Sequence, residues 1–499
     1  MKSSNTPDRA TQLLALRTRN FDIAIIGGGA TGLAIAFEAS QRGLSVALIE
    51  RADFSSGTSS RSTKLLHGGV RYLAQGNIRL VREALRERRL LIRMAPELAH
   101  PLRFVMPAYS WYEKPFYGAG LHLYDLLSGR HSLGPTRIVG TARTLVQSPG
   151  LRDVGLRGSV SYWDAQFDDS GMALVMARTA QQCGAVVVNY VSAESLDESA
   201  GRICGLRCLD RESGHEFTIK ARLVVNASGV WVDQFRTHSS MVQPSQGTHL
   251  VVDADFFPGE HALLIPRTRD GRVLFVVPWL GKRIIGTTDV PINSKSANPI
   301  PQDAEIEQLL GDLAPYLAKP PRREDVLSVW SGLRPLVHIA AGSGAGSTGA
   351  LSREHAIDID ARGLLTITGG KWTTCLEMAR DALKHAVAAG LVSAARQNSA
   401  RLDRLVKPIE VPHDRVPDAA TVQRLALEGF ARTVTDILAR RSRLLFLDAR
   451  AAIAAAPMVA RHLQTVINRD PDLDQFMTEA KHFLLKPSST VSAISATSS

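Results

Sequence analysis

The sequence predicts an α/β protein that begins with a strand, a tight turn, a helix and a second strand. Phe21–Ile26 is a short apolar run rich in isoleucine, which is typical of a buried parallel strand. The glycine-rich turn GGGATG follows at once, Leu33–Arg42 has the pattern of a helix, and Ser45–Ile49 is a second buried strand that ends at Glu50. These pieces in this order are typical of a Rossmann-like unit that binds a dinucleotide.

The turn matches the pattern GxGxxG, in which each glycine has a physical task. Gly27 permits the tight turn, Gly29 lets a pyrophosphate approach the backbone, and Gly32 allows the helix to pack closely on the strand. The start of the helix, at Ala30 and Thr31, offers free N–H groups and the positive end of the helix dipole. Glu50 is placed to accept hydrogen bonds from the adenosine ribose, which disfavours NADP because its ribose carries a phosphate there.

The composition of the 499-residue chain is ordinary for a globular protein, with 44% hydrophobic and 21% charged residues. It excludes a largely disordered, fibrous or collagen-like chain. No window offers about 18 uninterrupted apolar residues, and the polar start carries no secretion signal. We therefore expect neither a transmembrane helix nor export.

The net charge of +11 comes from arginines that are spread along the chain and form no block of like charge. The Arg/Glu mixture at Arg79–Arg93 indicates a solvated helix face. We expect no nucleic-acid partner, whereas anionic small substrates or an anionic membrane surface fit the charge. The four cysteines lack metal-ligand spacing, so we expect reduced thiols in a cytosolic chain and no metal site.

The segment after Glu50, RADFSSGTSSRSTKLLHGGVRY, is a long polar loop where an NAD domain would continue with another strand and helix. Such a loop can wrap a second phosphate, a ribityl chain and a ring, and its hydroxyls suit the many oxygens of FAD. FAD is therefore the expected cofactor. The loop residues predicted to bind it are Arg51, Ser62, Thr63, Lys64, Leu66, His67, Gly68 and Gly69.

The run SSRSTKLLHGGVRYL (Ser59–Leu73) resembles the flavin loop of the FAD-dependent, aerobic-type glycerol-3-phosphate dehydrogenases, in the D-amino-acid-oxidase-like flavoprotein superfamily. Further similar motifs follow in the same order: LVVNASGVWVD, SQGTHLVV, IIGTTD, SGLRPL, LSREH and GGKWTT. The resemblance covers about Asn20–Val392 and continues into a helical tail at Arg432–Ala452. Two positions depart from the family pattern, namely Gln246, where a lysine is frequent, and Cys375, where an aromatic residue is frequent.

The resemblance implies an FAD-binding Rossmann-like domain, a substrate domain built on an antiparallel sheet, and a C-terminal helical domain. The oxidoreductase region is expected at 18–396, with FAD-binding segments at about 20–75, 160–235 and 350–392. Substrate or cap segments are expected at about 76–159 and 240–349, the helical domain at 405–486, and flexible tails at 1–17 and 487–499. The small-residue stretch 340–350 indicates a loop.

Two later strands are expected to return to the cofactor. Leu223–Val225 leads to small residues, of which Ala227 and Gly229 are candidates for contact with the adenosine half; the alternative is a tight strand exit. Leu364–Thr368 leads to Gly370, Lys371, Trp372 and Thr373 near the flavin. Lys371 is a candidate catalytic residue beside the flavin N1/C2=O edge or the substrate phosphate, and the alternative is a surface lysine.

The stretches Ser245–Val252 and Val273–Asp289 indicate an antiparallel sheet over the flavin. The resemblance implies that His249, at the start of one strand, is the catalytic base or a close partner of it. Arginines in motifs are the candidates for phosphate recognition, because the guanidinium fork bonds phosphate oxygens in pairs. They are Arg71 beside Tyr72, Arg334, which is also a candidate catalytic residue, and Arg353.

The function that the resemblance implies is oxidation of sn-glycerol 3-phosphate to dihydroxyacetone phosphate by hydride transfer to flavin N5. It implies electron transfer to a membrane quinone and a cytoplasmic protein that is peripheral on the inner face of the cell membrane, and it leaves a homodimer open. The alternative is an oxidase of the same superfamily that uses oxygen, or an amine or another polyol phosphate. Arg440, Arg441 and Arg443 beside Leu444–Leu447 favour packing in a helix bundle over a membrane contact.

Overall fold

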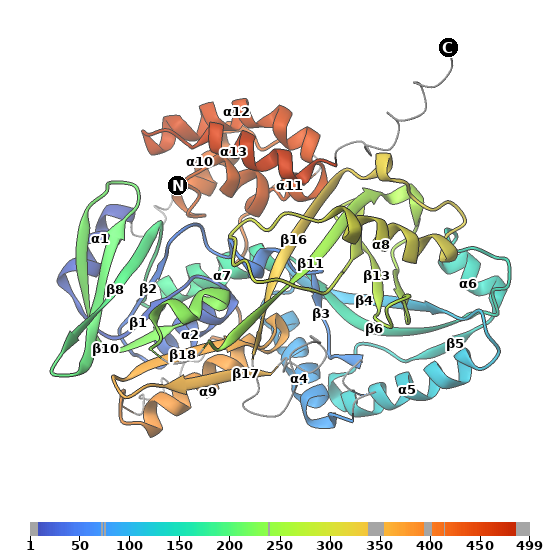
Figure 1. Ribbon diagram of the computed structural model, residues 1–499, viewed down its shortest axis with the longest axis horizontal. Helices are drawn as coiled ribbons and strands as arrows, with labels where there is room; N and C mark the ends of the chain where they lie inside the picture. The colour runs from blue at the N-terminus through green and yellow to red at the C-terminus, as the bar shows by residue number, and fades with distance from the viewer. Residues whose placement is uncertain are drawn as a thin grey trace, which may run out of the picture.

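The computed structural model describes residues 8–70, 73, 76–237, 240–337, 354–393, 402–413 and 415–485. Two β-sheets lie side by side, helices cover the first sheet and flank the second, and a group of C-terminal helices lies over both (Figure 1). The predicted class is confirmed: an α/β unit, a second and largely antiparallel sheet, and helices at the C-terminal end.

The first sheet contains all four strands that the sequence predicts around the cofactor. Its parallel core runs in the order β7–β2–β1–β10–β18, and β17, β8 and β9 add antiparallel pairs. Its strands are β1 (Asn20–Ile26), β2 (Val46–Glu50), β7 (Val186–Asn189), β8 (Val191–Ser199), β9 (Arg202–Asp210), β10 (Glu216–Asn226), β17 (His355–Ile359) and β18 (Leu364–Gly369). The predicted strands at 21–26, 45–49, 223–225 and 364–368 therefore lie next to one another.

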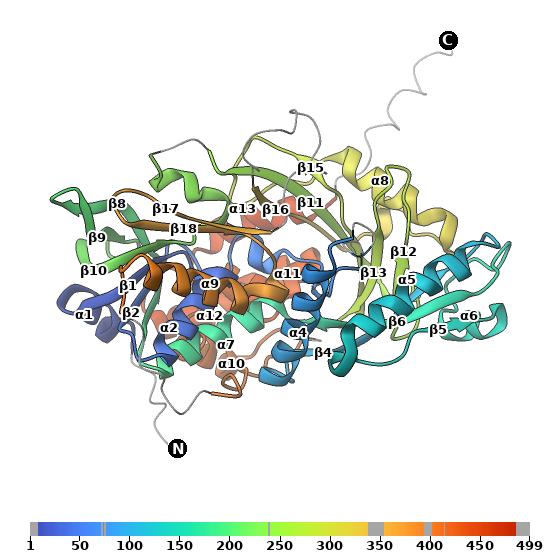
Figure 2. The ribbon, with the colours of Figure 1, turned by 90° about the horizontal axis from the view of Figure 1, so that it is seen from below.

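Both faces of this sheet are covered, which explains why β1 is apolar at every inner position. Ile23 and Ile25 face α2 (Ala30–Gln41), α7 (Asp169–Gln182) and α9 (Cys375–Ala388), which lie together under the sheet in Figure 2. Ala24 and Ile26 face the other core, which includes residues of β8 and β9 and of α1 (Arg9–Thr18). The prediction of a flexible tail was wrong for residues 9–17, because α1 buries Leu16 in this core.

The second sheet places a wall of strands beside the first. It contains β3 (Leu65–Leu66), β4 (Ala99–Pro107), β5 (Arg137–Val139), β6 (Ser159–Phe167), β11 (Val242–Asp253), β12 (Ala262–Ile265), β13 (Leu274–Trp279), β14 (Lys282–Gly286), β15 (Val290–Pro291) and β16 (Ser328–Val337). Except for the parallel pair β12–β4, the strands pair antiparallel. The predicted strands at 245–252 and 273–289 are confirmed as parts of β11, β13 and β14.

In the described residues, the second sheet is flanked by four helices, namely α4 (Ile78–Met94), α5 (Glu113–Ser128), α6 (Thr141–Gln147) and α8 (Asp303–Leu313). The predicted helix at 79–93 is confirmed as α4, but it is not solvated throughout. Glu87 and Arg88 are each 1% exposed, and Arg88 Nη1 bonds Asp164 Oδ1 at 2.8 Å. Charge alternation alone does not show which charged side chains a helix turns inward.

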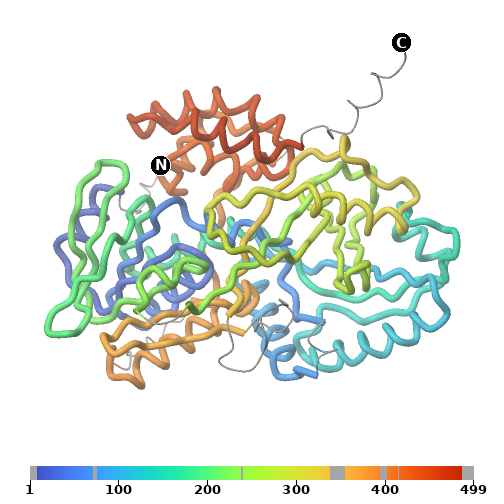
Figure 3. The backbone as a smooth tube through the Cα atoms, viewed as in Figure 1, coloured from blue at the N-terminus to red at the C-terminus, as the bar shows by residue number. Residues whose placement is uncertain are grey.

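The C-terminal helices are α10 (Ala419–Leu427), the π-helical turn η9 (Asp436–Arg441), α11 (Leu444–Leu447), α12 (Ala449–Ile467) and α13 (Leu473–Ala480). In the tube of Figure 3 this red segment lies across the boundary between the two sheets. It shares one hydrophobic core with the second sheet, in which Phe446 and Val459 belong with Trp330 and Val251. The helices therefore pack on the second sheet.

Two arginines of the predicted cluster, Arg440 and Arg441, tie these helices to the loop after β2, so the predicted packing role of the cluster is confirmed. Arg440 Nε and Arg441 Nη1 lie 2.5 and 2.7 Å from Asp53 Oδ2, which is fully buried on the loop after β2. Burial opposes ionisation of Asp53, but the charges of Arg441 and Arg440 hold its pKa below the ordinary value. Breaking such a buried pair typically costs about 3–5 kcal/mol, so the contact fixes the two parts firmly.

Candidate functional site

A large cavity of about 1970 Å³ lies where the two sheets and the C-terminal helices meet. The first sheet contributes the ends of β1, β2 and β18, and the second contributes β11 and β16. Of the candidate cofactor residues, the cavity wall includes Gly27, Gly29, Ala30, Thr31, Glu50, Arg51, Ser62, Thr63, His67, Gly69, Ala227, Gly229, Gly370, Lys371, Trp372 and Thr373. The sequence motifs therefore converge on one space.

The glycine turn has the geometry that its pattern predicts. Gly27 has φ +107°, and a Cβ there would lie 2.7 Å from the carbonyl oxygen of Ala227. A Cβ on Gly32 would lie 1.9 Å from the carbonyl oxygen of Gly27, so this glycine lets α2 pack against the turn. Gly32 itself is not on the cavity wall. The first turn of α2 points at the cavity through Ala30 and Thr31.

Glu50 ends β2 on the cavity wall. Its Oε2 accepts a hydrogen bond from the N–H of Gly28 at 2.7 Å, and its Oε1 accepts one from the N–H of Ala52 at 2.9 Å. Burial raises the pKa of Glu50 despite these two bonds. The carboxylate is thus held in a fixed orientation at the place where the motif puts an adenosine ribose.

The flavin loop divides into residues that face the cavity and residues that support it from behind. Ser62, Thr63, His67 and Gly69 line the cavity, whereas Lys64, Leu66 and Gly68 do not. Lys64 was expected to contact the cofactor, but its side chain is fully buried and pairs with Asp169. A side chain on Gly68 would meet the Tyr124 hydroxyl at 2.2 Å, so this position has no room for one.

His249 lies on β11 at the cavity wall and is 2% exposed. Its Nε2 lies 2.9 Å from Thr63 Oγ1, its ring stacks on Trp330 at 4.1 Å, and among the described residues its Nδ1 has no hydrogen-bond partner. Burial and the charges of Arg334 and Lys64 lower the pKa of His249 well below its ordinary value of 6.5. The imidazole is therefore neutral near pH 7 and able to accept a proton.

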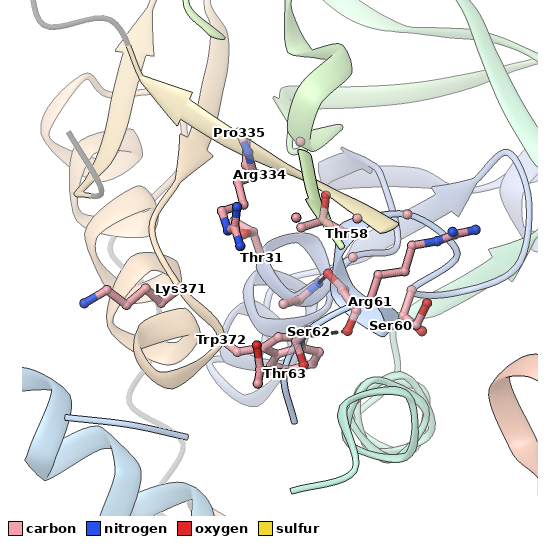
Figure 4. A pocket seen from close by; sticks show the side chains of 18 of the residues that line it. Thr31, Thr58, Ser60, Arg61, Ser62, Thr63, Arg334, Pro335, Lys371 and Trp372 are labelled. Carbon is pink, nitrogen blue, oxygen red and sulfur yellow. Dashed lines mark hydrogen bonds between the residues drawn. The ribbon is translucent and has the colours of Figure 1, made fainter. Parts of the chain in front are cut away.

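Arg334 projects from β16 into the same cavity (Figure 4). Its Nη1 lies 3.2 Å from Asp289 Oδ1, and its Nη2 lies 3.0 Å from the carbonyl oxygen of Thr288 and 3.1 Å from Thr287 Oγ1. These contacts hold the guanidinium in one orientation beside His249. A fixed cation next to a neutral base is a suitable setting for an anionic substrate that loses a proton.

The turn after β18 holds the flavin loop in place. Trp372 Nε1 donates to the carbonyl oxygen of Ser59 at 2.8 Å, and Thr373 Oγ1 donates to the carbonyl oxygen of His67 at 3.4 Å. Lys371 is on the cavity wall, but Figure 4 shows its side chain pointing away from Arg334 and the flavin loop. The structure thus brings His249 and Arg334 together, and it does not bring Lys371 to them.

Three candidate residues lie outside the described residues, namely Arg71, Tyr72 and Arg353, and so does the stretch 340–350. The two departures from the family pattern lie off the cavity wall. Gln246 is buried, and its Nε2 donates to Glu305 Oε2 at 2.7 Å. Cys375 is buried at the start of α9, where burial raises the pKa of its thiol. Neither residue therefore borders the cavity.

The sequence did not single out several residues that shape the site. Arg61 lines the cavity and donates from Nη1 to the carbonyl oxygen of Ser331 at 3.0 Å, which ties the loop to β16. Burial, together with the charge of Arg440, lowers the pKa of Arg61 to about 10. Asp169 supports the loop from α7 by accepting a bond from Ser62 Oγ at 2.7 Å. These contacts join segments far apart in the chain, so no local sequence pattern predicts them.

The residues present fit FAD. The glycine turn and the first turn of α2 line the cavity, Glu50 is oriented at the end of β2, and the loop that carries Ser62 and Thr63 bounds the rest of the cavity. The volume accommodates a large cofactor together with a small substrate. Thr31, Thr58 and Ser60–Thr63 lie along this wall in Figure 4.

Comparisons with known proteins agree with this site. The family model described as "FAD dependent oxidoreductase" (DAO) matches residues 22–380. The chain is 37% identical to the mitochondrial glycerol-3-phosphate dehydrogenase of Macaca fascicularis over 96% of this chain and 75% of that protein. It is 35% identical to the mitochondrial glycerol-3-phosphate dehydrogenase of Schizosaccharomyces pombe over 96% of this chain and 89% of that protein.

A solved structure with bound FAD is similar to this chain over nearly its whole length. The glycerol-3-phosphate dehydrogenase from Bacillus halodurans complexed with FAD superposes with a TM-score of 0.73 at 25% identity, covering 96% of this chain and 99% of that one. The family resemblance and the FAD cofactor predicted from the motifs are confirmed. The chain therefore belongs to the FAD-dependent oxidoreductase family and, within it, to the glycerol-3-phosphate dehydrogenases.

Proposed function

We propose that the chain oxidises sn-glycerol 3-phosphate to dihydroxyacetone phosphate, with FAD as the hydride acceptor. The observation that carries the proposal is the pairing of a neutral imidazole, His249, with a fixed guanidinium, Arg334, on one wall of the FAD cavity. The names of the relatives and of the FAD-bound structural neighbour support the same substrate.

In this mechanism Arg334 binds the substrate phosphate, helped by Arg71 beside Tyr72 and by Arg353, and so orients C2. His249 Nε2 accepts the proton of the C2 hydroxyl by way of Thr63 Oγ1, which lies 2.9 Å from it: the Thr63 hydroxyl donates its own proton to Nε2 and takes the proton that the C2 hydroxyl loses. When bound, FAD accepts the hydride from C2 at its N5. Lys371 remains a candidate for a supporting charge at the far side of the cavity.

The proposal is tested by anaerobic bleaching of the flavin absorbance of the purified holoenzyme. We expect rapid bleaching by sn-glycerol 3-phosphate and only slow bleaching by glycerol, because glycerol lacks the group that Arg334 binds. Equal rates with both compounds would contradict phosphate recognition, and no bleaching by either would contradict the substrate. The reduced enzyme is then mixed with oxygen or a short-chain quinone, and faster reoxidation by oxygen would favour the oxidase alternative.

We propose further that the acceptor is a membrane quinone and that α5 faces the membrane at its peripheral site. In the described part of the chain, no helix has the length and apolar content to cross a membrane. The outer face of α5 and its flank is unusually apolar, with Trp111 76%, Phe116 71% and Leu126 77% exposed. Phe116 also lines the cavity, so this face adjoins the flavin space.

The charge around α5 suits an anionic lipid surface, because Arg130, Arg137 and Arg143 are exposed nearby. The double variant W111E/L126E is expected to lose co-sedimentation with vesicles that contain anionic lipid. Its flavin bleaching in solution should stay close to that of the parent, since both residues are exposed on the outer face and lie off the cavity wall. Unchanged co-sedimentation would contradict α5 as the contact.

A further inference from the structure

A second buried ionic cluster lies behind the flavin loop, beside the candidate base. It consists of Lys64, Asp169 and Arg443, each 0% exposed, and we call it the Lys64 cluster. Lys64 Nζ lies 2.7 Å from Asp169 Oδ2, and Arg443 Nη2 lies 2.8 Å from Asp169 Oδ1. The carboxylate is thus shared between the flavin loop and the C-terminal helices.

The cluster reaches the base through an aromatic ring. Lys64 Nζ lies 4.9 Å from the centre of the Trp330 ring, and Trp279 and Phe446 complete a cage around it at 5.2 and 5.3 Å. The His249 ring stacks on the same Trp330 with an interplanar angle of 17°. An ammonium and an imidazole therefore touch one indole, within a buried region where charges act strongly on each other.

The backbone gives a second link. Lys64 has φ +63°, a left-handed conformation that typically costs a non-glycine residue about 1–3 kcal/mol. Such a conformation persists where the surrounding contacts stabilise it, and here the contacts of the buried Lys64 side chain stabilise it. The preceding residue is Thr63, whose Oγ1 lies 2.9 Å from His249 Nε2. Holding Lys64 therefore also aims Thr63 at the imidazole.

The charged groups around His249 and Lys64 determine whether Lys64 raises or lowers the pKa of His249. Burial is the largest cause of the lowered pKa of His249. The positive charges of Arg334 and Lys64, which face the imidazole, also disfavour its protonated form. Lys64 is faced by Asp169, Arg443 and Asp168, and burial lowers its pKa to about 7. Below pH 7 Lys64 is therefore charged, and this is the range in which protonation of His249 would stop the reaction.

We propose that Lys64 is a positioning residue, which acts through Trp330 and Thr63 to hold the imidazole of His249 in place and unprotonated. Asp169 holds Lys64 and is itself held by Arg443, so the C-terminal helices contribute to the positioning of the base. This inference rests on the proposed function, since it takes His249 as the base.

The test is the pH profile of anaerobic flavin bleaching by saturating sn-glycerol 3-phosphate, measured on FAD-loaded enzyme with the flavin content determined for each variant. In Lys64→Met the positive charge is lost, so the acid limb of the profile should move up by about one pH unit. Lys64→Arg keeps the charge and should keep the parent's limb. Asp169→Asn removes the negative charge that favours the protonated form of Lys64, so Lys64 becomes neutral at a lower pH. The acid limb should then move in the same direction as in Lys64→Met.

The control is Lys384→Met on α9, which removes an exposed lysine and should leave the profile unchanged. If Lys64→Met does not retain FAD, Asp169→Asn decides the question. A limb that stays in place in the flavin-loaded neutral variant, even with a lower rate, would overturn the proposal and leave Lys64 a purely structural role. If the parent enzyme is not bleached at all, the proposed function fails instead, which separates the two outcomes.

Discussion

Replacement of Arg334 by alanine is expected to lower kcat/KM for sn-glycerol 3-phosphate by roughly 10²–10⁴-fold. A guanidinium that binds a buried anionic group typically contributes about 3–5 kcal/mol, which corresponds to that range. Loss of the charge also raises the pKa of His249, since Arg334 is one of the causes that lower it. Rates should therefore be compared near pH 9, where the imidazole is neutral in both enzymes.

The readout that identifies a phosphate contact is the ratio of the bleaching rates with sn-glycerol 3-phosphate and glycerol. This ratio should collapse in Arg334→Ala and fall only about tenfold in Arg334→Lys, which keeps the charge but loses the planar fork. Asp289→Asn is the matched control, because Asp289 binds the same guanidinium. If Asp289→Asn and Arg334→Ala lowered the bleaching rates with sn-glycerol 3-phosphate and with glycerol by the same factor, Arg334 would have only a structural role.

The parts of the fold that the sequence predicted depend on local chemistry. The turn at Gly27 and the close packing at Gly32 need glycine wherever a strand, a phosphate turn and a helix follow one another, so the pattern is readable within a few residues. The strands at 223–225 and 364–368 were readable as apolar runs between turn residues. Their order in the sheet, in which β10 lies between β1 and β18, was not predicted, since no local signal gives strand order.

The rest of the site depends on contacts between distant segments. The sequence identified Lys64 as a residue near the cofactor, but its partner Asp169 lies 105 residues further on, and Arg443, which binds the same carboxylate, lies 379 residues further on. Asp53 and the arginines of η9 are a similar case. No periodicity marks a buried ion pair, because either partner alone looks like an ordinary surface charge.

His249 was identified by the resemblance, and the structure supplies the physical reason why it suits a base. A histidine in a polar surface loop would be half-protonated near pH 6.5. Here β11 and β16 place the ring against Trp330 and beside Arg334, so that burial and charge together keep it neutral. The sequence shows the histidine, but only the paired strands show its environment.

Replacement of His249 by asparagine is expected to slow flavin bleaching by sn-glycerol 3-phosphate by about 10²–10⁴-fold, the usual contribution of a general base. Because the pKa of His249 lies well below 6.5, the parent rate should be flat above about pH 6.5 and fall only in more acidic solution. The protonated form cannot accept the C2 hydroxyl proton, so this acid limb should vanish in the variant.

Two further variants serve as controls. His249→Phe keeps a ring against Trp330 and should be as slow as His249→Asn. His261 also has a lowered pKa but lies off the cavity wall, so His261→Asn should match the parent. An acid limb that survives unchanged in a flavin-loaded His249→Asn would assign the base to another residue.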